Sequence, residues 1–200
     1  MRIGVVIPAY NRPGLVVESL QTIAEQDRPA DQVVVVDDCS TDETADRIAE
    51  WIKDRDGWSL VRMSKNQGPA AARNRGIEAL SGADLIAFLD SDDLWPREHL
   101  ARIERAAAKR PEAVAIVADQ LVARKDGRSR LRKADWAQGR VLVGLIRRGG
   151  CTPSALAVSA AASARVGGFK DSMRCHEDLE FLLRLSEIGP FVRADGPPVS

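Results

Sequence analysis

Two groups of aspartates follow apolar runs, and their spacing suits metal and phosphate chemistry. Asp90 and Asp92 come directly after the apolar residues 85–89, and Asp38 comes just after the four valines at 33–36. Because side chains alternate along an extended segment, Asp90 and Asp92 should point to the same side. Carboxylates suit hard cations such as Mg²⁺ and Mn²⁺, and magnesium is often held by one or two carboxylates together with substrate phosphates. The pattern therefore predicts a sparse metal site that works with a phosphorylated ligand.

Each group also has a plainer interpretation. The second group could be a solvated acidic turn, in which Asp93 caps a helix ahead of Pro96. In the first group, a strand-end carboxylate can accept hydrogen bonds from a base edge or a ribose, while residues 40–43 match a capping box. We expect both in the first group, with Asp38 facing the ligand and the residues after it capping the next helix.

A third segment, residues 66–74, reads Asn-Gln-Gly-Pro-Ala-Ala-Ala-Arg-Asn and is typical of a helix start. Pro69 suits the first helical position. Arg73 would then lie on the first turns, where its guanidinium could reach a phosphate or a nearby carboxylate. The alternative is the start of an ordinary surface helix.

The first half of the chain predicts the scaffold that brings these segments together. Short apolar runs alternate with helical patterns; the runs are residues 3–7 (which end at Pro8), 33–36, 60–63 and 85–89. This order of strand and helix predicts a parallel sheet with helices on both faces. Ligands bind outside the carboxyl ends of the strands in such sheets. Residues 8–11, 37–38 and 90–93 would then meet at one edge of the sheet.

The second half is less regular. Residues 113–118 and 155–158 predict strands, and residues 125–128 predict a turn or hairpin tip. Residues 177–185 predict an amphipathic helix with Asp178 in its first turn. We place a soft boundary near Gln120, inside one domain of residues 1–200.

Composition excludes some functions. Lys plus Arg and Asp plus Glu both number 29, so the chain lacks the basic surplus typical of nucleic-acid-binding proteins. No apolar run approaches the ~20 residues needed to cross a bilayer, and no signal peptide is evident. Cys39, Cys151 and Cys175 show neither close pairing nor metal-ligand spacing, which favours a reducing, cytoplasmic setting. Peripheral contact with the inner membrane stays open. The basic residues within 124–133 indicate either a solvated hairpin or a contact for an anionic acceptor such as a lipid phosphate.

Five motifs in order resemble the family 2 glycosyltransferases, whose GT-A fold is an α/β, Rossmann-like arrangement with a mixed, mainly parallel sheet flanked by helices. The motifs are residues 5–11 (Val-Val-Ile-Pro-Ala-Tyr-Asn), 35–42, 66–74, 88–93 (Phe-Leu-Asp-Ser-Asp-Asp), and 166–169 followed by 176–178 (His-Glu-Asp). The resemblance implies an inverting, metal-dependent glycosyltransferase that moves a sugar from a nucleoside-diphosphate sugar, with UDP preferred. The acceptor would be a hydroxyl of a glycan, a lipid-linked molecule or another glycoconjugate.

The resemblance also implies roles for single residues. Those implied to bind the donor are Pro8, Tyr10, Asn11, Asp38, Arg73 and Asp90. Mn²⁺ or Mg²⁺ would bind Asp92 directly, with Asp90 beside it, and Asp178 would be the catalytic base. Residues 1–120 would be the half that binds the nucleotide sugar, and residues 121–200 the acceptor side.

Departures from the family pattern leave alternatives open. The Gln-x-x-Arg-Trp motif and membrane helices of processive polymer synthases are absent, which argues against polymer synthesis. The chain ends soon after Val192, so we expect either a compact member or one truncated at its C-terminus. A sugar nucleotidyltransferase would need a Gly-rich loop with Arg and Lys where residues 8–13 read Pro-Ala-Tyr-Asn-Arg-Pro. A non-catalytic nucleotide-sugar-binding module would have Asp178 pointing away from the donor.

Overall fold

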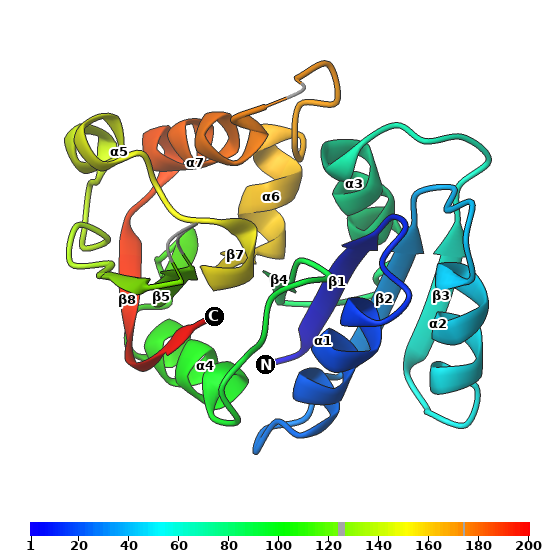
Figure 1. Ribbon diagram of the computed structural model, residues 1–200. Helices are drawn as coiled ribbons and strands as arrows, with labels where there is room; N and C mark the ends of the chain where they lie inside the picture. The colour runs from blue at the N-terminus through cyan, green and yellow to red at the C-terminus, as the bar shows by residue number, and fades with distance from the viewer. Residues whose placement is uncertain (124–126, 174) are drawn as a thin grey trace.

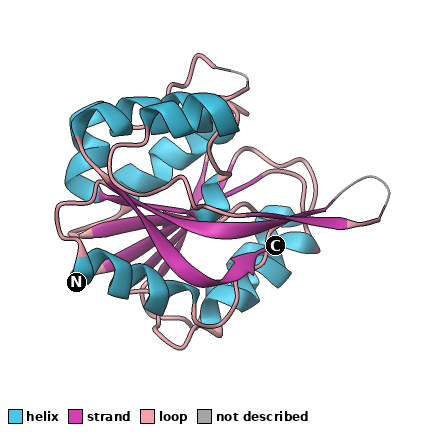
Figure 2. Ribbon diagram, turned by 90° about the vertical axis from the view of Figure 1, so that its left-hand side faces the viewer, coloured by secondary structure: helices cyan, strands magenta, loops and turns pink. Residues whose placement is uncertain are grey.

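The computed structural model describes residues 1–123, 127–173 and 175–200, which form one mixed sheet with helices on both faces (Figures 1 and 2). The strands are β1 Ile3–Ala9, β2 Gln32–Asp37, β3 Trp58–Arg62, β4 Leu85–Phe88, β5 Ala115–Ala123, β6 Ser129–Arg132, β7 Leu156–Ser159 and β8 Phe191–Val199. The helices are α1 Leu15–Ala24, α2 Thr44–Ile52, α3 Pro69–Ala79, α4 His99–Lys109, α5 Leu142–Arg148, the 3₁₀ turn Pro153–Ala155, α6 Ala160–Val166 and α7 Glu177–Ile188.

Strand direction decides which side chains can meet. The sheet order is β3-β2-β1-β4-β7-β5-β6, and β8 pairs with β5 outside this path. Strands β1 to β4 pair in parallel, whereas β7 runs antiparallel to both β4 and β5. Strand β5 therefore runs in the same direction as β4, so the carboxyl ends of β1, β2, β4 and β5 face one edge. This confirms the predicted mixed, mainly parallel α/β sheet.

The valines of β2 show how the sequence builds the layers. Val33 and Val35 belong to the large core cluster that includes Ile48 of α2, whereas Val34 and Val36 pack with residues such as Ala72 of α3. Alternate side chains of a strand point to opposite faces, so a continuous apolar run is needed when both faces are covered. Helix α3 thus covers one face of the first half and α2 the other.

Helix α3 lies unusually close to the sheet because of Gly76. A Cβ atom at this position would lie 2.3 Å from Cγ1 of Val6 and 3.3 Å from Cγ2 of Val36. Without that Cβ, the helix can approach the strands, and its first turn reaches the edge where the strands end.

The expected end of the first strand was wrong. Strand β1 does not end at Pro8 but continues to Ala9, with Pro8 in register with Val36. Proline is tolerated because pairing with β4 stops at Val6, so the missing N–H of Pro8 would have no strand partner on that side.

The predicted capping box at residues 40–43 is also absent. Helix α2 begins at Thr44, and Glu43 precedes it without a side-chain cap. The Asp42 carboxylate accepts from the Thr44 N–H at 2.9 Å, and the Ser40 hydroxyl instead accepts from the N–H of Asn11 at 3.0 Å. Local side-chain bonds to neighbouring loops therefore replace the expected cap.

The second half departs further from expectation. The expected boundary near Gln120 falls inside β5, so the sheet continues across it. The hairpin is confirmed by the antiparallel pairing of β5 with β6, although its tip at residues 124–126 lies outside the described residues. Ala155 belongs to the 3₁₀ turn, and β7 begins one residue later.

Helix α4 joins the two halves. The N–H of Leu100 donates to the Gln26 side chain at 2.9 Å. The buried guanidinium of Arg102 donates to the carbonyl oxygens of three residues of β8, which are Ala194, Asp195 and Pro197.

Within the described residues, no helix is long and apolar enough to span a bilayer.

Candidate functional site

A cleft of about 470 Å³ opens at the edge where β1, β2 and β4 end. It is lined by Pro8, Ala9, Tyr10, Arg12, Asp38, Asn66, Pro69, Ala72, Arg73, Asp90, Ser91 and Asp92. The predicted meeting of the three strand ends is therefore confirmed, and the start of α3 joins them. Six of the eight residues named from the sequence line this cleft; Asn11 and Asp178 are not among the lining residues.

Asp38 holds the loop before α3 in place at the cleft. Its side chain is 3% exposed, and its two carboxylate oxygens accept from the backbone N–H groups of Gln67 at 2.8 Å and Gly68 at 2.7 Å. These bonds fix the loop that enters α3, where Gly68 has a φ of +89°. Each carboxylate oxygen has a second lone pair, so a bond to a bound base remains compatible with this geometry.

Asn11 bonds to the neighbouring loop, and its implied role in donor binding stays a prediction. Its carbonyl oxygen accepts from the Thr41 N–H at 2.9 Å, and its amide donates to the Thr41 hydroxyl at 3.3 Å. Asn11 therefore ties the loop after β1 to the loop after β2. Both polar atoms of its side chain take part in these bonds, and Asn11 is not among the residues that line the cleft.

Arg73 connects the two halves of the molecule. Its guanidinium is nearly buried and donates to Oδ1 of Asp90 at 2.6 Å and to Oε1 of Glu177 at 3.2 Å. It also lies over the Phe169 ring, 5.4 Å from the ring centre. Burial by itself lowers the pKa of Arg73, but the charges and hydrogen bonds of Asp90 and Glu177 outweigh it, so the pKa is raised. Arg73 therefore remains a cation inside the protein.

The aspartates after β4 crowd one another. Asp93 is mostly buried, and burial raises the pKa of its carboxyl; the Ser154 hydrogen bond opposes this, and the charges of Asp90 and Asp92 add to it. Ser154 also accepts from the N–H of Asp90 at 2.9 Å. Asp92 is the accessible member, with its side chain 46% exposed and 3.6 Å from Arg12. The site thus presents negative charge that a cation would compensate.

The donor set of this site fits a magnesium or manganese ion shared with phosphates. Among the described residues, no three His, Cys, Asp or Glu side chains gather around one possible metal position. Asp90 and Asp92 supply hard carboxylate oxygens, which suit these cations when substrate phosphates and water complete the shell. A closed structural metal cage does not fit, because it would need more protein ligands.

Asp178 lies in the first turn of α7, beside the Arg73 bridge. Helix α7 begins after His176, which has a φ of 59° and makes no side-chain cap. Oδ1 of Asp178 accepts from the N–H of Leu179 at 2.7 Å. Burial raises the pKa of Asp178 and the charge of Glu177 raises it further, while the Leu179 N–H and Arg73 oppose the shift. The ion pair of Glu177 with Arg73 holds this helix start against the donor cleft.

Sequence reasoning missed two residues of the site. Ser154 is completely buried and lies 64 positions from Asp90, so no sequence spacing signals their contact. Arg12 lines the cleft and contacts Asp92. Its position directly after the Pro-Ala-Tyr-Asn segment could have indicated that it belongs to the site.

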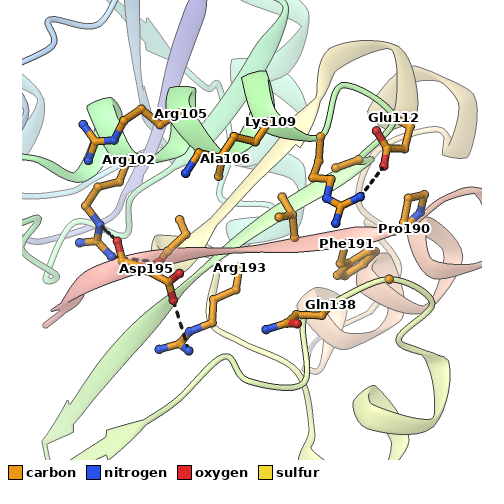
Figure 3. A pocket seen from close by; sticks show the side chains of 15 residues that line it. Arg102, Arg105, Ala106, Lys109, Glu112, Gln138, Pro190, Phe191, Arg193 and Asp195 are labelled. Atoms are coloured by element: carbon orange, nitrogen blue, oxygen red, sulfur yellow. Dashed lines mark hydrogen bonds and ion pairs between the residues drawn. The ribbon is translucent and has the colours of Figure 1, made fainter.

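A second cleft, of about 480 Å³, lies between α4 and the first part of β8 (Figure 3). It contains none of the residues named from the sequence. Several of its cations are already paired, because Arg193 binds Asp119 and Asp195 and Arg110 lies 3.9 Å from Glu112. The candidate site is therefore the cleft at the strand ends.

Comparison with solved structures defines the class of fold. The structure of *Staphylococcus aureus* TarS 1–349 in complex with UDP-GlcNAc has a TM-score of 0.82 at 22% identity, over 100% of this chain and 58% of that one. The mannosyltransferase PcManGT from *Pyrobaculum calidifontis*, in complex with GDP-Man and Mn²⁺, has a TM-score of 0.75 at 26% identity, over 98% of this chain and 55% of that one. The chain has the GT-A fold.

The sequence comparison then gives the family. The model of "Glycosyl transferase family 2" matches residues 4–166, so the chain belongs to this family. The succinoglycan biosynthesis protein ExoO of *Rhizobium meliloti* (strain 1021) is 40% identical over 126 residues, which are 62% of this chain and 34% of that protein. The chain spans less than two thirds of each of these relatives.

Proposed function

We propose that the protein is a metal-dependent, inverting glycosyltransferase that moves a sugar from a UDP-sugar to an acceptor hydroxyl in glycan or glycoconjugate synthesis. The observation that carries the proposal is the Arg73 bridge. It joins Asp90 in the donor cleft to Glu177, the neighbour of Asp178. A donor site and a candidate base are thereby held together in one rigid arrangement.

The donor's phosphates would lie near Asp90 and Asp92. Mg²⁺ or Mn²⁺ held between these carboxylates and the diphosphate would neutralise the charge that develops on the leaving group. Asp38 and the loop it fixes form the far wall of the cleft, and Tyr10, which is 43% exposed, is free to stack on a base. Arg73 keeps the Asp90 carboxylate oriented.

Asp178 is the residue that would accept the proton of the acceptor hydroxyl. A general base works best when its pKa approaches the working pH, and burial raises the pKa of Asp178 in that direction. Attack by the activated hydroxyl on the face opposite the leaving diphosphate inverts the anomeric carbon. No second carboxylate nucleophile is needed for a single displacement.

Replacement of Asp178 by Asn tests the reaction. The amide keeps the size and much of the ability to accept from the Leu179 N–H, but it cannot take a proton. We expect turnover to fall ~10²-fold or more, while donor affinity stays within a few-fold and the melting temperature is unchanged. A variant that melts early but turns over normally when cold would make Asp178 structural, with Glu177 the next candidate base. Donor binding without turnover in the unmodified protein would favour a binding module instead.

Uridine is the proposed base of the donor. The carboxylate of Asp38 can accept from the N3–H of a uracil ring, a donor that adenine lacks at the matching edge. TarS is described in complex with UDP-GlcNAc, but PcManGT is described with GDP-Man, so the relatives do not agree on one base. Competition binding of UDP, dTDP, GDP and ADP in the presence of Mn²⁺ decides the matter, and tighter binding of GDP or ADP would overturn the uridine assignment.

We place the reaction in the cytoplasm. The described structure has all three cysteines as free thiols, with Cys151 buried and Cys175 exposed. Exposed thiols persist most readily in a reducing compartment. Fractionation of cells that express the tagged protein tests this location.

A further inference from the structure

Basic charge is concentrated in one part of a neutral chain. Residues 127–150 contain seven Lys or Arg and one Asp or Glu, a formal net charge of +6, whereas the whole chain has 29 of each kind. The remaining residues therefore carry a net charge of −6. Such asymmetry indicates a partner of negative charge for this segment.

Exposed apolar side chains gather in the same part. Among the described residues, nine large hydrophobic side chains are exposed, and five of them lie between residues 121 and 146. On α5, Val141 just before the helix and Leu145 within it are buried, whereas Val143 and Ile146 are 62% and 69% exposed. One side of this short helix thus packs against the protein, and the other side exposes aliphatic side chains to solvent.

Exposed cations lie on α5, just before it and on the neighbouring hairpin segment. Arg130 and Lys133 from the hairpin and Arg147 from α5 line one hollow of about 580 Å³. Arg140 is exposed two residues before α5 begins. Aliphatic and cationic side chains are therefore presented together on one helix and the hairpin beside it.

The position of this surface relates it to the proposed acceptor side. Helix α5 packs against α7, the helix whose first turn holds Asp178 (Figure 1). The hairpin begins at the carboxyl end of β5, which faces the same edge of the sheet as Asp90. The surface and the donor cleft thus open toward the same edge.

We infer that α5 and its basic surroundings dock on an anionic lipid bilayer. The docking face consists of Leu142, Val143 and Ile146 with Arg130, Lys133, Arg140 and Arg147. A bilayer surface takes both kinds of side chain, because aliphatic groups enter the interface and cations meet anionic headgroups. An anionic polymer would use only the cations. This inference goes beyond the proposed reaction, because it states where the protein would meet its acceptor.

Vesicle co-sedimentation tests the docking face. Phosphatidylcholine vesicles are compared with vesicles that contain about one third phosphatidylglycerol, at low and high salt. We expect binding to the anionic vesicles only, weakened by salt. The double variant Val143→Ser with Ile146→Ser should lower the vesicle affinity tenfold or more. The double variant Arg140→Gln with Arg147→Gln should also lower it roughly tenfold or more.

Matched controls come from other parts of the surface. Arg105→Gln with Lys109→Gln removes two exposed cations from α4, which lies at the bottom of Figure 1, whereas α5 lies at the top. Leu15→Ser removes a leucine that is 41% exposed on α1. Both controls should bind vesicles as the unmodified protein does. UDP affinity and melting temperature should be the same in all variants, which separates this test from that of the reaction.

Three outcomes would overturn the inference. The first is absence of binding to anionic vesicles, or equal binding by the Val143→Ser, Ile146→Ser variant. The second is a dimer in analytical ultracentrifugation that this variant converts to a monomer, since a second copy would then cover the face. The third is binding of soluble polyphosphate as tightly as vesicles with no effect of the aliphatic changes, which would identify an anionic polymer as the partner.

Discussion

The two halves of the molecule differ in the regularity of their strands and helices. The first half repeats strand and helix, so its strand ends fall at one edge and its loops form the donor cleft. The second half inserts the antiparallel strands β6 and β7 and short helices, and it carries the basic and apolar surface. The first half thus presents short polar loops at one edge, whereas the second holds the proposed base and the proposed docking face on less regular elements. Under the proposed function, donor binding would depend on the regular scaffold and acceptor access on the irregular one.

Few side chains join the two halves of the molecule at the candidate site. Arg73 bridges Asp90 and Glu177, and Ser154 meets the backbone of Asp90 from the second half. Changes of exposed side chains within one half should therefore alter donor binding or turnover without lowering the stability of the fold. Changes at the junction should affect the stability of the whole fold.

The largest effect is expected from Asp92→Asn, which touches only the donor half. The amide removes the charge that would hold the cation, so transfer should fall ~10³-fold or more. Calorimetry of UDP binding with and without Mn²⁺ should show that the metal no longer strengthens binding. Because the Asp92 side chain is 46% exposed, the melting temperature should not change. Asp56→Asn is the matched control, because Asp56 is exposed and lies just before the amino end of β3, at the other edge of the sheet. Unchanged metal-dependent affinity in Asp92→Asn would refute the metal assignment.

Arg73→Met tests the junction itself. The change leaves Asp90 and Glu177, whose side chains are 25% and 14% exposed, without their cation. Breaking a buried ion pair on one side is strongly destabilising, so we expect the free energy of unfolding to fall by about 3 kcal/mol. Urea denaturation measures this loss.

The control for this change is Arg47→Met, which breaks an exposed pair with Glu43 on α2. That pair should contribute less than ~1 kcal/mol. Equal losses in the two variants would show that Arg73 is not a structural bridge. Arg73→Lys should recover part of the stability because it restores a charge without the two-pronged geometry.

The regular half could be predicted from the sequence because its signals are local. The valines at 33–36 mark a strand covered on both faces, and Pro69 marks a helix start that the structure confirms. The meeting of Asp38, Asp90 and Asp92 followed from strand direction alone. The bond between Asn11 and Thr41 did not, because it depends on how two loops pack.

The irregular half could not be predicted to the same extent, for a physical reason. Strand β8 contains Gly196, Pro197 and Pro198, which are poor strand formers, and its pairing with β5 is a long-range contact. The contacts of Arg73 with Glu177 and of Asp90 with Ser154 likewise join residues 104 and 64 positions apart. Such contacts depend on tertiary packing and cannot be predicted from a local sequence pattern.

A smaller effect is expected from Gly76→Ala, which tests the packing of the regular half. The new Cβ would lie 2.3 Å from Cγ1 of Val6, inside a packed core. Overpacking of this kind should lower the free energy of unfolding by about 2 kcal/mol, even though alanine favours helix formation. Gly14→Ala, where no atom lies within 4 Å of the new Cβ, is the control and should be close to neutral. Adding Val6→Ala removes the clashing methyl groups, so Gly76→Ala should cost less in that background; an unchanged cost would refute the steric explanation.

The smallest effect concerns His99, the first residue of α4. Its ring is completely buried and stacks on Trp95 with 4.5 Å between ring centres. Neither ring nitrogen has a hydrogen-bond partner among the residues that the structure describes. Burial, with a smaller contribution from the charge of Arg102, lowers the pKa of His99 from its ordinary value of 6.5 to about 3. The folded protein therefore keeps this histidine neutral over the range in which the unfolded chain takes up a proton.

The sign of the pH effect follows from that difference. Below pH 6.5 the unfolded state binds one more proton at this site than the folded state, so acid favours unfolding until about pH 3 is reached. The contribution of His99 to the loss of stability between pH 6.5 and pH 5.0 should be roughly 1.5 kcal/mol. His99→Phe keeps an aromatic ring against Trp95 but cannot bind a proton. Urea denaturation of both proteins at several pH values should show a shallower acid loss in His99→Phe, by about that amount. Parallel stability curves for the two proteins would mean that His99 is protonated in the folded state or reached by water, and that α4 does not seal the junction between the halves.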